Sequence, residues 1–430
     1  MIKSIAHFLR YTIGSFFIFS GFVKAIDPIG TAIKMEEYFT VFTEYFPALT
    51  SFWEFWADMS LPLSIFMIAL EMILGVALLV GVYFNLSVLL VFGMLLFFTF
   101  LTGFTLYTGK VTDCGCFGDF MKLKPVETFG KDVVLTILTA ILWFLRGHLT
   151  KIKGSSLNLF LGLVLLITLW VLWFFSYGIS GSLVIIGLIA FSALMYSYIN
   201  SVGIKTSVAF IAFCLGSIFF TGFTFRNVMN LPIVDFRAYK IGTDLRDCTS
   251  TEGLDMGETV SKFVMAKGDE EKTVGLKEYS ALLKEGWEYR DRIDVVIREA
   301  EEPKCKDFRI IDDEGGEWQE DLVLEAQGVT LIVSSYDIDK GDAEGFAEIA
   351  NLVKQTKAKG AKAIGLTGSK ITAANALANN AYQYYNLDAV PIKTMNRSNP
   401  GLTVVKNGVL VGKYHYNYLP TVDELMQLKK

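Results

Sequence analysis

The sequence predicts a membrane all-α helical bundle of about seven spans, followed by a water-soluble α/β domain. The charge distribution supports this prediction, because residues 1–226 contain 13 Lys and Arg with 11 Asp and Glu, which leaves 26 and 33 for residues 227–430. Soluble domains carry roughly 25% charged residues, so the first half is too poor in charge to be one. No segment is strongly basic, and nucleic acid is therefore excluded as a partner.

Seven segments are apolar and long enough to cross a bilayer, for which about 20 residues are needed. Between Ser60 and Gly109 the only charged residue is Glu71, and residues 154–204 contain no Asp, Glu, Lys, Arg or His. No small-residue cleavage site follows the first segment, so we interpret it as a retained anchor rather than a signal peptide. The predicted spans are residues 5–25, 61–82, 86–108, 131–147, two within 154–204, and 206–225.

The basic residues of the short loops predict the orientation of these spans. Cytoplasmic loops are enriched in Lys and Arg, and with seven spans all of these residues fall on one face. The amino end is then cytoplasmic, and the carboxy-terminal domain lies on the periplasmic side of the cell inner membrane. The residues concerned are Lys3, Arg10, Arg146, Lys151, Lys153 and Lys205.

Residues 35–58 mix aromatic and acidic side chains, a composition typical of the membrane–water boundary. One interpretation is a short amphipathic helix that lies on, or dips into, the outer surface. The other is a lid packed over the helical bundle. The sequence leaves both open.

The loop between the third and fourth spans contains TDCGCFGDF, residues 112–120, in which Gly115 alone separates Cys114 from Cys116. Two sulfurs this close would oxidise to a small strained ring, and strained disulfides are the more easily reduced ones. The sequence therefore predicts a candidate redox pair outside the cytoplasm, where disulfides persist. The alternative is a permanent disulfide that pins the loop. Two thiols are too few for a closed metal site, so no metal is expected.

Glu71 falls near the middle of the second span, where a carboxylate is costly and commonly functional or paired. It is a candidate proton or quinone site. The alternative is a structural hydrogen bond to Ser, Thr or Tyr of a neighbouring helix, since the apolar spans show no basic partner. Lys24 and Asp27, at the outer end of the first span, are candidate neighbours of the cysteine loop, or they only mark the membrane interface.

Three segments of residues 1–148 resemble the MauE/DoxX group of four-helix membrane proteins: SGFVKAIDP (20–28), ALEMILGVALLVG (69–81) and DCGCFGD (113–119). The resemblance to MauE implies periplasmic thiol–disulfide chemistry and maturation of a disulfide-rich methylamine dehydrogenase subunit. The resemblance to DoxX implies electron transfer on the quinone side, with quinone as a possible cofactor. Residues 149–226, with three further helices, depart from the four-helix pattern.

Residues 305–430 alternate between strands and helices, which predicts a sheet with helices on both faces. We expect a hairpin at 307–317, strands at 329–338 and 361–368, and helices at 342–358, 370–384 and 421–428. Residues 401–415 are predicted to form two strands joined through Asn407-Gly408, a strong hairpin signal. Residues 227–304 are expected to connect the membrane part to this domain.

The segment NPGLTVVKNG (399–408) resembles the part of thioredoxin-like domains, of the peroxiredoxin/TlpA type, in which a cis-proline precedes a strand. Pro400 would be that proline, and the alternative is an ordinary loop proline. The resemblance places catalytic cysteines after the strand that ends near Ile338, where the sequence is DIDKGDAEG and contains no Cys. The domain is therefore expected to bind a partner rather than exchange disulfides. Cys248 and Cys305 are candidates for a bridge, or both are free thiols.

Together these features predict a membrane protein that supports thiol–disulfide or electron transfer outside the cytoplasm, or the maturation of a periplasmic partner protein. The rival hypothesis is a non-catalytic scaffold or assembly protein whose thioredoxin-like domain binds that partner. Whether the chain is an enzyme, a component of a membrane thiol–disulfide oxidoreductase, is left open at this stage.

Overall fold

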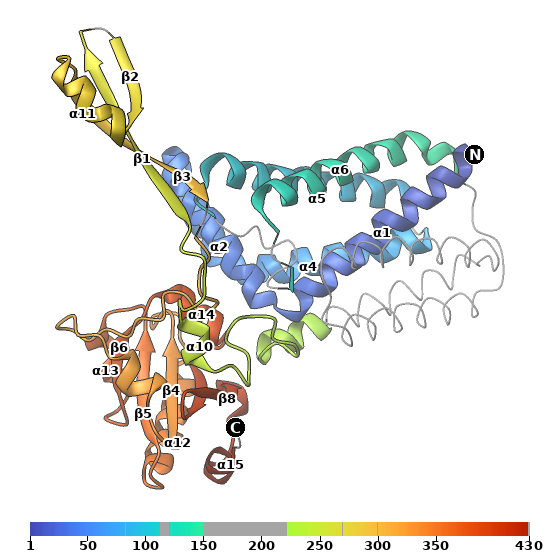
Figure 1. Ribbon diagram of the computed structural model, residues 1–430. Helices are drawn as coiled ribbons and strands as arrows, with labels where there is room; N and C mark the ends of the chain where they lie inside the picture. The colour runs from blue at the N-terminus through green and yellow to red at the C-terminus, as the bar shows by residue number, and fades with distance from the viewer. Residues whose placement is uncertain are drawn as a thin grey trace. The chain divides into compact units, whose positions relative to one another are not determined.

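The computed structural model describes residues 1–81, 83–111, 120–121, 123–149, 222–268, 270–298 and 300–428. The chain divides into two compact units, Met1–Arg237 and Ala238–Lys430 (Figure 1). The last three predicted spans and the two cysteines of the 112–120 motif lie outside the described residues.

Unit 1 contains four helices that, among the described residues, are long and apolar enough to cross a membrane. They are α1 (Ile2–Ile26), α4 (Ser60–Val80), α5 (Phe84–Thr108) and α6 (Pro125–Leu145), with a 3₁₀ turn η3 (Arg146–His148) after α6. The predicted first four spans are confirmed as helices. Aliphatic and aromatic side chains from all four helices, among them Ile13, Leu78, Val91 and Leu142, form one buried cluster.

Glycines set the close approach of α1 to α4. A Cβ atom added at Gly75 would lie 2.7 Å from Ile18 Cγ1 and 2.9 Å from the carbonyl oxygen of Gly14. Because the backbone of one helix lies this close to the other, neither position has room for a side chain. Small residues at such contacts are the usual means of packing helices tightly in a bilayer.

The aromatic segment forms two helices, α2 (Pro28–Tyr45) and α3 (Thr50–Asp58), with a 3₁₀ turn η1 (Pro47–Leu49) between them. Its buried face packs into an aromatic cluster with α5, in which the Tyr38 hydroxyl lies 2.7 Å from Thr105 Oγ1. Trp53 of α3 stacks on Phe39 with ring centroids 6.1 Å apart. The packed-lid interpretation therefore describes α2, whereas no residue of α3 is buried.

Unit 2 contains a three-stranded and a five-stranded sheet. The smaller sheet is antiparallel, with the strand order β2-β1-β3. It was not predicted from the sequence. Its elements are β1 (Glu258–Lys267), β2 (Glu270–Gly275) and β3 (Glu288–Arg298), with α11 (Leu276–Lys284) between β2 and β3.

The larger sheet has the order β6-β5-β4-β7-β8, in which β4, β5 and β6 are parallel and β7 and β8 form an antiparallel hairpin. Asn407 and Gly408 both take positive φ at the hairpin turn, as predicted. The strands are β4 (Val329–Ser335), β5 (Lys362–Thr367), β6 (Gln383–Asn386), β7 (Gly401–Lys406) and β8 (Val409–His415).

Helices α12 (Ala343–Lys357) and α15 (Val422–Gln427) match two predicted helices. The predicted helix 370–384 is wrong in its second half, since α13 spans Ile371–Leu377 and β6 follows at Gln383. Asn379 and Asn380 between them take positive φ, a conformation in which a helix cannot continue. The predicted hairpin 307–317 is reduced to a single bridge between Ile311 and Glu317. The remaining elements are α10 (Leu245–Thr249), the π-helical turn η4 (Glu320–Leu324), α14 (Ala389–Met395) and the 3₁₀ turn η5 (Tyr416–Tyr418).

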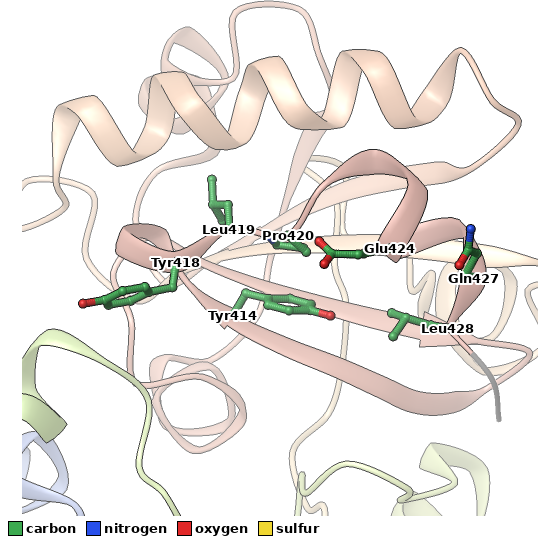
Figure 2. Close-up of a pocket in the computed structure, with 7 residues that line it drawn as sticks. All are labelled: Tyr414, Tyr418, Leu419, Pro420, Glu424, Gln427 and Leu428. Carbon is green, nitrogen blue, oxygen red and sulfur yellow. The ribbon is translucent and has the colours of Figure 1, made fainter.

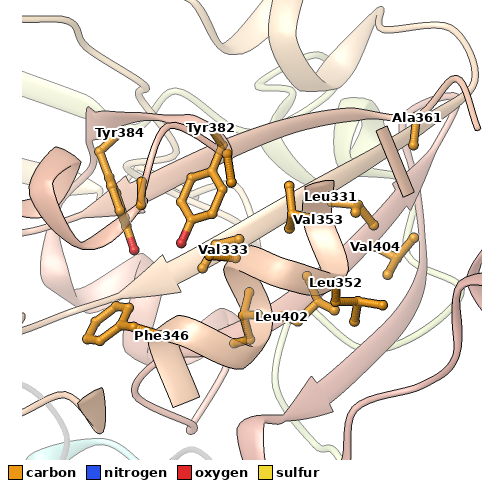
Figure 3. Packing of buried hydrophobic residues seen from close by; sticks show 14 of the residues in the cluster. Leu331, Val333, Phe346, Leu352, Val353, Ala361, Tyr382, Tyr384, Leu402 and Val404 are labelled. Atoms are coloured by element: carbon orange, nitrogen blue, oxygen red, sulfur yellow. The ribbon is translucent and has the colours of Figure 1, made fainter. Parts of the chain in front are cut away.

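Hydrophobic clusters cover both faces of the larger sheet. Successive side chains of a strand point to opposite faces, so a strand that is apolar throughout needs a cluster on each side. Leu331 and Val333 of β4 point into the cluster under α12, which includes Phe346, Tyr382 and Tyr384 (Figure 3). Ile332, between them, points into a second cluster with α14 and residues 239–248. The two faces therefore have separate cores.

Candidate functional site between the membrane helices

A buried ion pair joins α1 to α4. Lys24 Nζ lies 2.5 Å from Glu71 Oε1, and the two side chains are 6% and 1% exposed. Lys24 Nζ also donates to Ser20 Oγ at 3.1 Å and lies 4.7 Å from the centroid of the Phe98 ring. The predicted partner of Glu71, a Ser, Thr or Tyr, is thus corrected to a lysine. The attraction between the two opposite charges offsets part of the free energy that is needed to remove them from water.

The backbone of α1 makes this pair possible. Ser20 and Lys24 are four residues apart and therefore share one face of the helix. Gly21 lies beside them, and a Cβ atom there would approach Met72 Sδ to 2.7 Å and Glu71 Cβ to 3.2 Å. Only a residue without a side chain at position 21 lets α4 bring Glu71 within reach of Lys24. The segment SGFVK therefore combines the polar groups with the space they need.

A second ion pair lies on α6. Lys131 Nζ is 2.8 Å from Asp132 Oδ1, and the side chain of Asp132 is 2% exposed. Each of these two lysines, Lys24 and Lys131, therefore has a carboxylate beside it within the bundle. This pairing limits the desolvation cost of placing four charged groups among apolar helices.

A small cavity lies where the two pairs meet. Its volume, for the centre of a water-sized sphere, is about 10 Å³, which is near the minimum that holds one water molecule. The second carboxylate oxygen of Glu71, Oε2, is buried without a hydrogen-bond partner. Among the described residues, those that line the cavity are Phe16, Phe17, Ser20, Lys24, Glu71, Leu95, Phe98, Lys131, Asp132 and Leu135.

The cysteine motif is flanked by two anchored residues. Cys114 and Cys116 lie outside the described residues, but Val111 on one side is buried in the aromatic cluster of α2 and α5. Phe120, on the other side, packs edge-on against Phe19 of α1 with ring centroids 6.0 Å apart. The chain leaving the motif therefore contacts α1 at Phe19.

Asp27 and Arg10 mark the two ends of the buried region of α1. Asp27 caps α2, because its Oδ1 accepts a hydrogen bond from the backbone N–H of Gly30 at 2.9 Å. Arg10 is buried and donates from Nε to the carbonyl of Leu78 at 2.5 Å and from Nη2 to that of Leu79 at 2.9 Å. These carbonyls end α4, where a helix leaves its acceptors unsatisfied and favours a cation. Both residues therefore have structural roles.

In unit 2, the structure joins Cys248 and Cys305 in a disulfide with Cα atoms 5.2 Å apart. The Asn399–Pro400 peptide bond is cis. Asn399 connects this bend to the end of β4, because its Oδ1 accepts from Ser335 Oγ at 2.7 Å and its Nδ2 donates to the carbonyl of Asp337 at 2.6 Å. The loop after β4 is thus held by neutral polar groups.

An open groove of about 670 Å³ lies between β8 and α15 (Figure 2). Its carboxylate, Glu424, is already engaged, since it accepts from the backbone N–H of Thr421 at 2.7 Å. Tyr414, Tyr418, Leu419, Pro420 and Leu428 supply most of the lining. Glu424 and Gln427 complete the described lining. Among the described residues, no group of three or more His, Cys, Asp or Glu is arranged to hold a metal ion.

Lys24, Glu71 and the cysteine motif all fall within one stretch of the chain that a known family shares. Residues 2–145 match the family model of the methylamine utilisation protein MauE. The match includes α1, α4, α5 and α6, the polar cavity, and DCGCFGD. It supports a membrane protein with several candidate spans. No curated protein and no solved structure matches the chain.

The sequence identified Glu71, but it did not identify its pairing with Lys24 or the participation of Asp132. Lys24 was predicted to lie near the cysteine loop, at the end of a span, where cations commonly mark the interface. The signal that could have found the pair is Gly21: a glycine between two polar residues on a helix indicates that another backbone approaches them closely.

Proposed function

We propose that the MauE-like domain, residues 1–148, carries out or supports thiol–disulfide exchange outside the cytoplasm, with Cys114 and Cys116 as the redox pair. The observation that carries the proposal is the match to the MauE family over residues 2–145, which spans the two cysteines. Oxidation of two thiols to a disulfide releases two electrons and two protons. The electrons would pass to a quinone or to a partner protein, and a nearby proton acceptor would assist the reaction.

Glu71 fits the role of that proton acceptor better than the role of a quinone site. Its Oε2 atom has room for a proton, whereas the cavity beside it holds about one water molecule. A quinone ring is several times larger.

We further propose that three helices in residues 149–226 bring the number of membrane spans to seven. Residues 305–430 would form a thioredoxin-like domain on the periplasmic side of the inner membrane, and residues 227–304 would connect it to the last span. The strand order of the larger sheet, with a parallel β4-α12-β5 unit beside an antiparallel hairpin and a final helix, supports the last point. The loop after β4, residues 336–342, contains no cysteine where that chemistry would need one. This domain would therefore bind a periplasmic partner protein.

Thiol trapping of the full-length protein in membranes, across a series of redox buffers, tests the redox role. Cys114 and Cys116 should interconvert between dithiol and disulfide at a potential above the roughly −300 mV typical of structural disulfides. Cys114→Ser and Cys116→Ser should each abolish cycling while leaving folded abundance nearly unchanged, because so small a ring adds little stability. Cys214→Ser, in another apolar segment, is the matched control and should cycle normally.

The rival function, a scaffold whose cysteines only staple a loop, predicts a different result. The pair would stay oxidised in every buffer, or the serine variants would disappear from the membrane. Either outcome rejects the redox role. Thiols that never oxidise would reject both functions and the predicted orientation of this loop.

A further inference from the structure

We propose that strand β3 pairs edge to edge with β3 of a second copy of this chain, antiparallel and with Ile293 on a two-fold axis. The smaller sheets of the two copies would then form one continuous sheet. This inference concerns a surface of unit 2, and it goes beyond the redox function proposed for the membrane helices.

β3 is a long strand with one free edge. It has 11 residues and lies last in the order β2-β1-β3 (Figure 1). In the part of the chain that the structure describes, β1 is its only strand partner, and its described side chains are exposed or half-buried. An unpaired edge presents a row of backbone N–H and C=O groups that can bind another strand. The question is therefore which strand would bind there.

The charges of β3 favour a second copy of the same strand. When two identical strands pair antiparallel across a two-fold axis, each residue faces the one that lies equally far on the other side of the axis. With Ile293 on the axis, Arg292 faces Asp294 of the second copy. Further out, Glu288 faces Arg298 of the second copy. Opposite charges that face each other across strands are stabilising, whereas like charges are destabilising.

Moving the axis by one residue to either side brings like charges together. With Arg292 on the axis two guanidinium groups face each other, and with Asp294 on the axis two carboxylates do. With Ile293 on the axis the whole strand pairs, and no like charges face each other. Residues 291–296 of β3 pair with β1 without a register shift, so the strand is regular around this axis.

The two central charged residues are held in place within each copy. Arg292 Nε lies 2.8 Å from Asp294 Oδ1, and both side chains are about half exposed. Ser261 of β1 also donates a hydrogen bond to Asp294 Oδ1, at 2.5 Å. A single exposed ion pair contributes little stability. Pairing across the axis would join the two ion pairs into one network, in which each charge has a partner on both strands.

Disulfide cross-linking of the full-length protein in membranes tests this register. Ile293→Cys, in a background of Cys114→Ser, Cys116→Ser and Cys214→Ser, should form an intermolecular disulfide. Facing residues of antiparallel strands have Cα atoms about 4.5–5.5 Å apart, a distance that a disulfide spans. Tyr289→Cys is the matched control, since Tyr289 is 51% exposed and Ile293 is 45% exposed. The two copies of residue 289 would lie more than about 20 Å apart, so this variant should cross-link at least about tenfold more slowly.

Charge exchange tests the recognition itself. Arg292→Asp and Asp294→Arg should each abolish the cross-link of Ile293→Cys, because like charges then face each other across the axis. Coexpression of these two variants should restore the cross-link between them, and the double variant Arg292→Asp/Asp294→Arg should restore it between identical copies. Lys284→Glu, on α11, changes the net charge by the same amount as Arg292→Asp and should leave the cross-link unchanged.

Equal cross-linking through residues 289 and 293, no cross-link through residue 293, or a cross-link to a different protein would overturn the proposal. So would a double variant that is as abundant as the parent but does not recover the cross-link. The background variant lacks Cys114 and Cys116, so the outcome does not depend on the proposed redox function.

Discussion

Helices α1 and α5 have the same length, 25 residues, but they differ in charge and in how much of each is buried. α5 contains no charged residue and only 33% of its most apolar stretch is buried in the protein. α1 carries Arg10 and Lys24, is the least apolar of the four candidate spans, and is 89% buried in the same sense. Arg10 and Lys24 of α1 are buried by other parts of the protein, whereas α5, which is more exposed in the protein, contains no charged residue.

The largest expected effect comes from removing one member of the α1–α4 ion pair. Lys24→Met leaves Glu71 as an uncompensated buried carboxylate, and breaking a buried pair in this way typically costs about 3–5 kcal/mol. We expect a matching loss of unfolding free energy in detergent. Leu96→Met, at a position of α5 that is 48% exposed, is the control and should change stability by less than about 0.5 kcal/mol. Equal losses in the two variants would remove the distinction between the helices.

His415 in unit 2 provides a contrast to the Lys24–Glu71 pair, because it is a buried titratable group that lacks a counter-charge strong enough to keep it ionised. His415 in unit 2 is 5% exposed, and burial lowers its pKa from 6.5 to about 4, although Asp342 acts in the opposite direction. The unfolded chain therefore binds a proton before the folded one does. Stability contributed by the neutral imidazole is complete above pH 6.5 and declines as the pH falls toward 4, by at most about 3 kcal/mol.

Proteolysis of the full-length protein, read at unit 2, measures this pH dependence. His415→Gln should flatten the profile between pH 6.5 and pH 4. His148, which lies in an exposed turn after α6, provides the control, and His148→Gln should leave the profile unchanged. An unaltered slope in His415→Gln would show that another group is responsible.

The smallest expected effect concerns the packing that shields α1. Gly75→Ala places a Cβ atom against the backbone of α1, and overpacking of this kind costs about 1–3 kcal/mol. Gly93→Ala on α5 is the matched control, since no atom lies within 4 Å of its added Cβ. It should be neutral or stabilising by up to about 1 kcal/mol, because Ala is the better helix former. The thermal unfolding midpoints of the two variants should therefore move in opposite directions, or only that of Gly75→Ala should fall.

The sequence predicts the elements that depend on local signals. Long apolar runs identify α1, α4, α5 and α6, and the Asn407-Gly408 turn identifies the β7–β8 hairpin. It does not predict features that depend on how distant segments align. Lys24 and Glu71 meet only because α1 and α4 pack with their glycines in register. Gly21 indicates that another backbone approaches closely, but it does not say which residue of α4 lies opposite Lys24. The β1–β3 sheet was missed because its exposed strands lack a regular apolar alternation.

A double-mutant cycle on Lys24 and Glu71 tests the central claim most directly, namely that α1 carries charge because a partner and a protein shell compensate it. The unfolding free energies of the parent, Lys24→Met, Glu71→Leu and the double variant would be measured in one detergent. The account predicts a coupling energy of at least about 2 kcal/mol, with the double variant more stable than Lys24→Met. A coupling energy near zero, with the two losses simply adding, would contradict it.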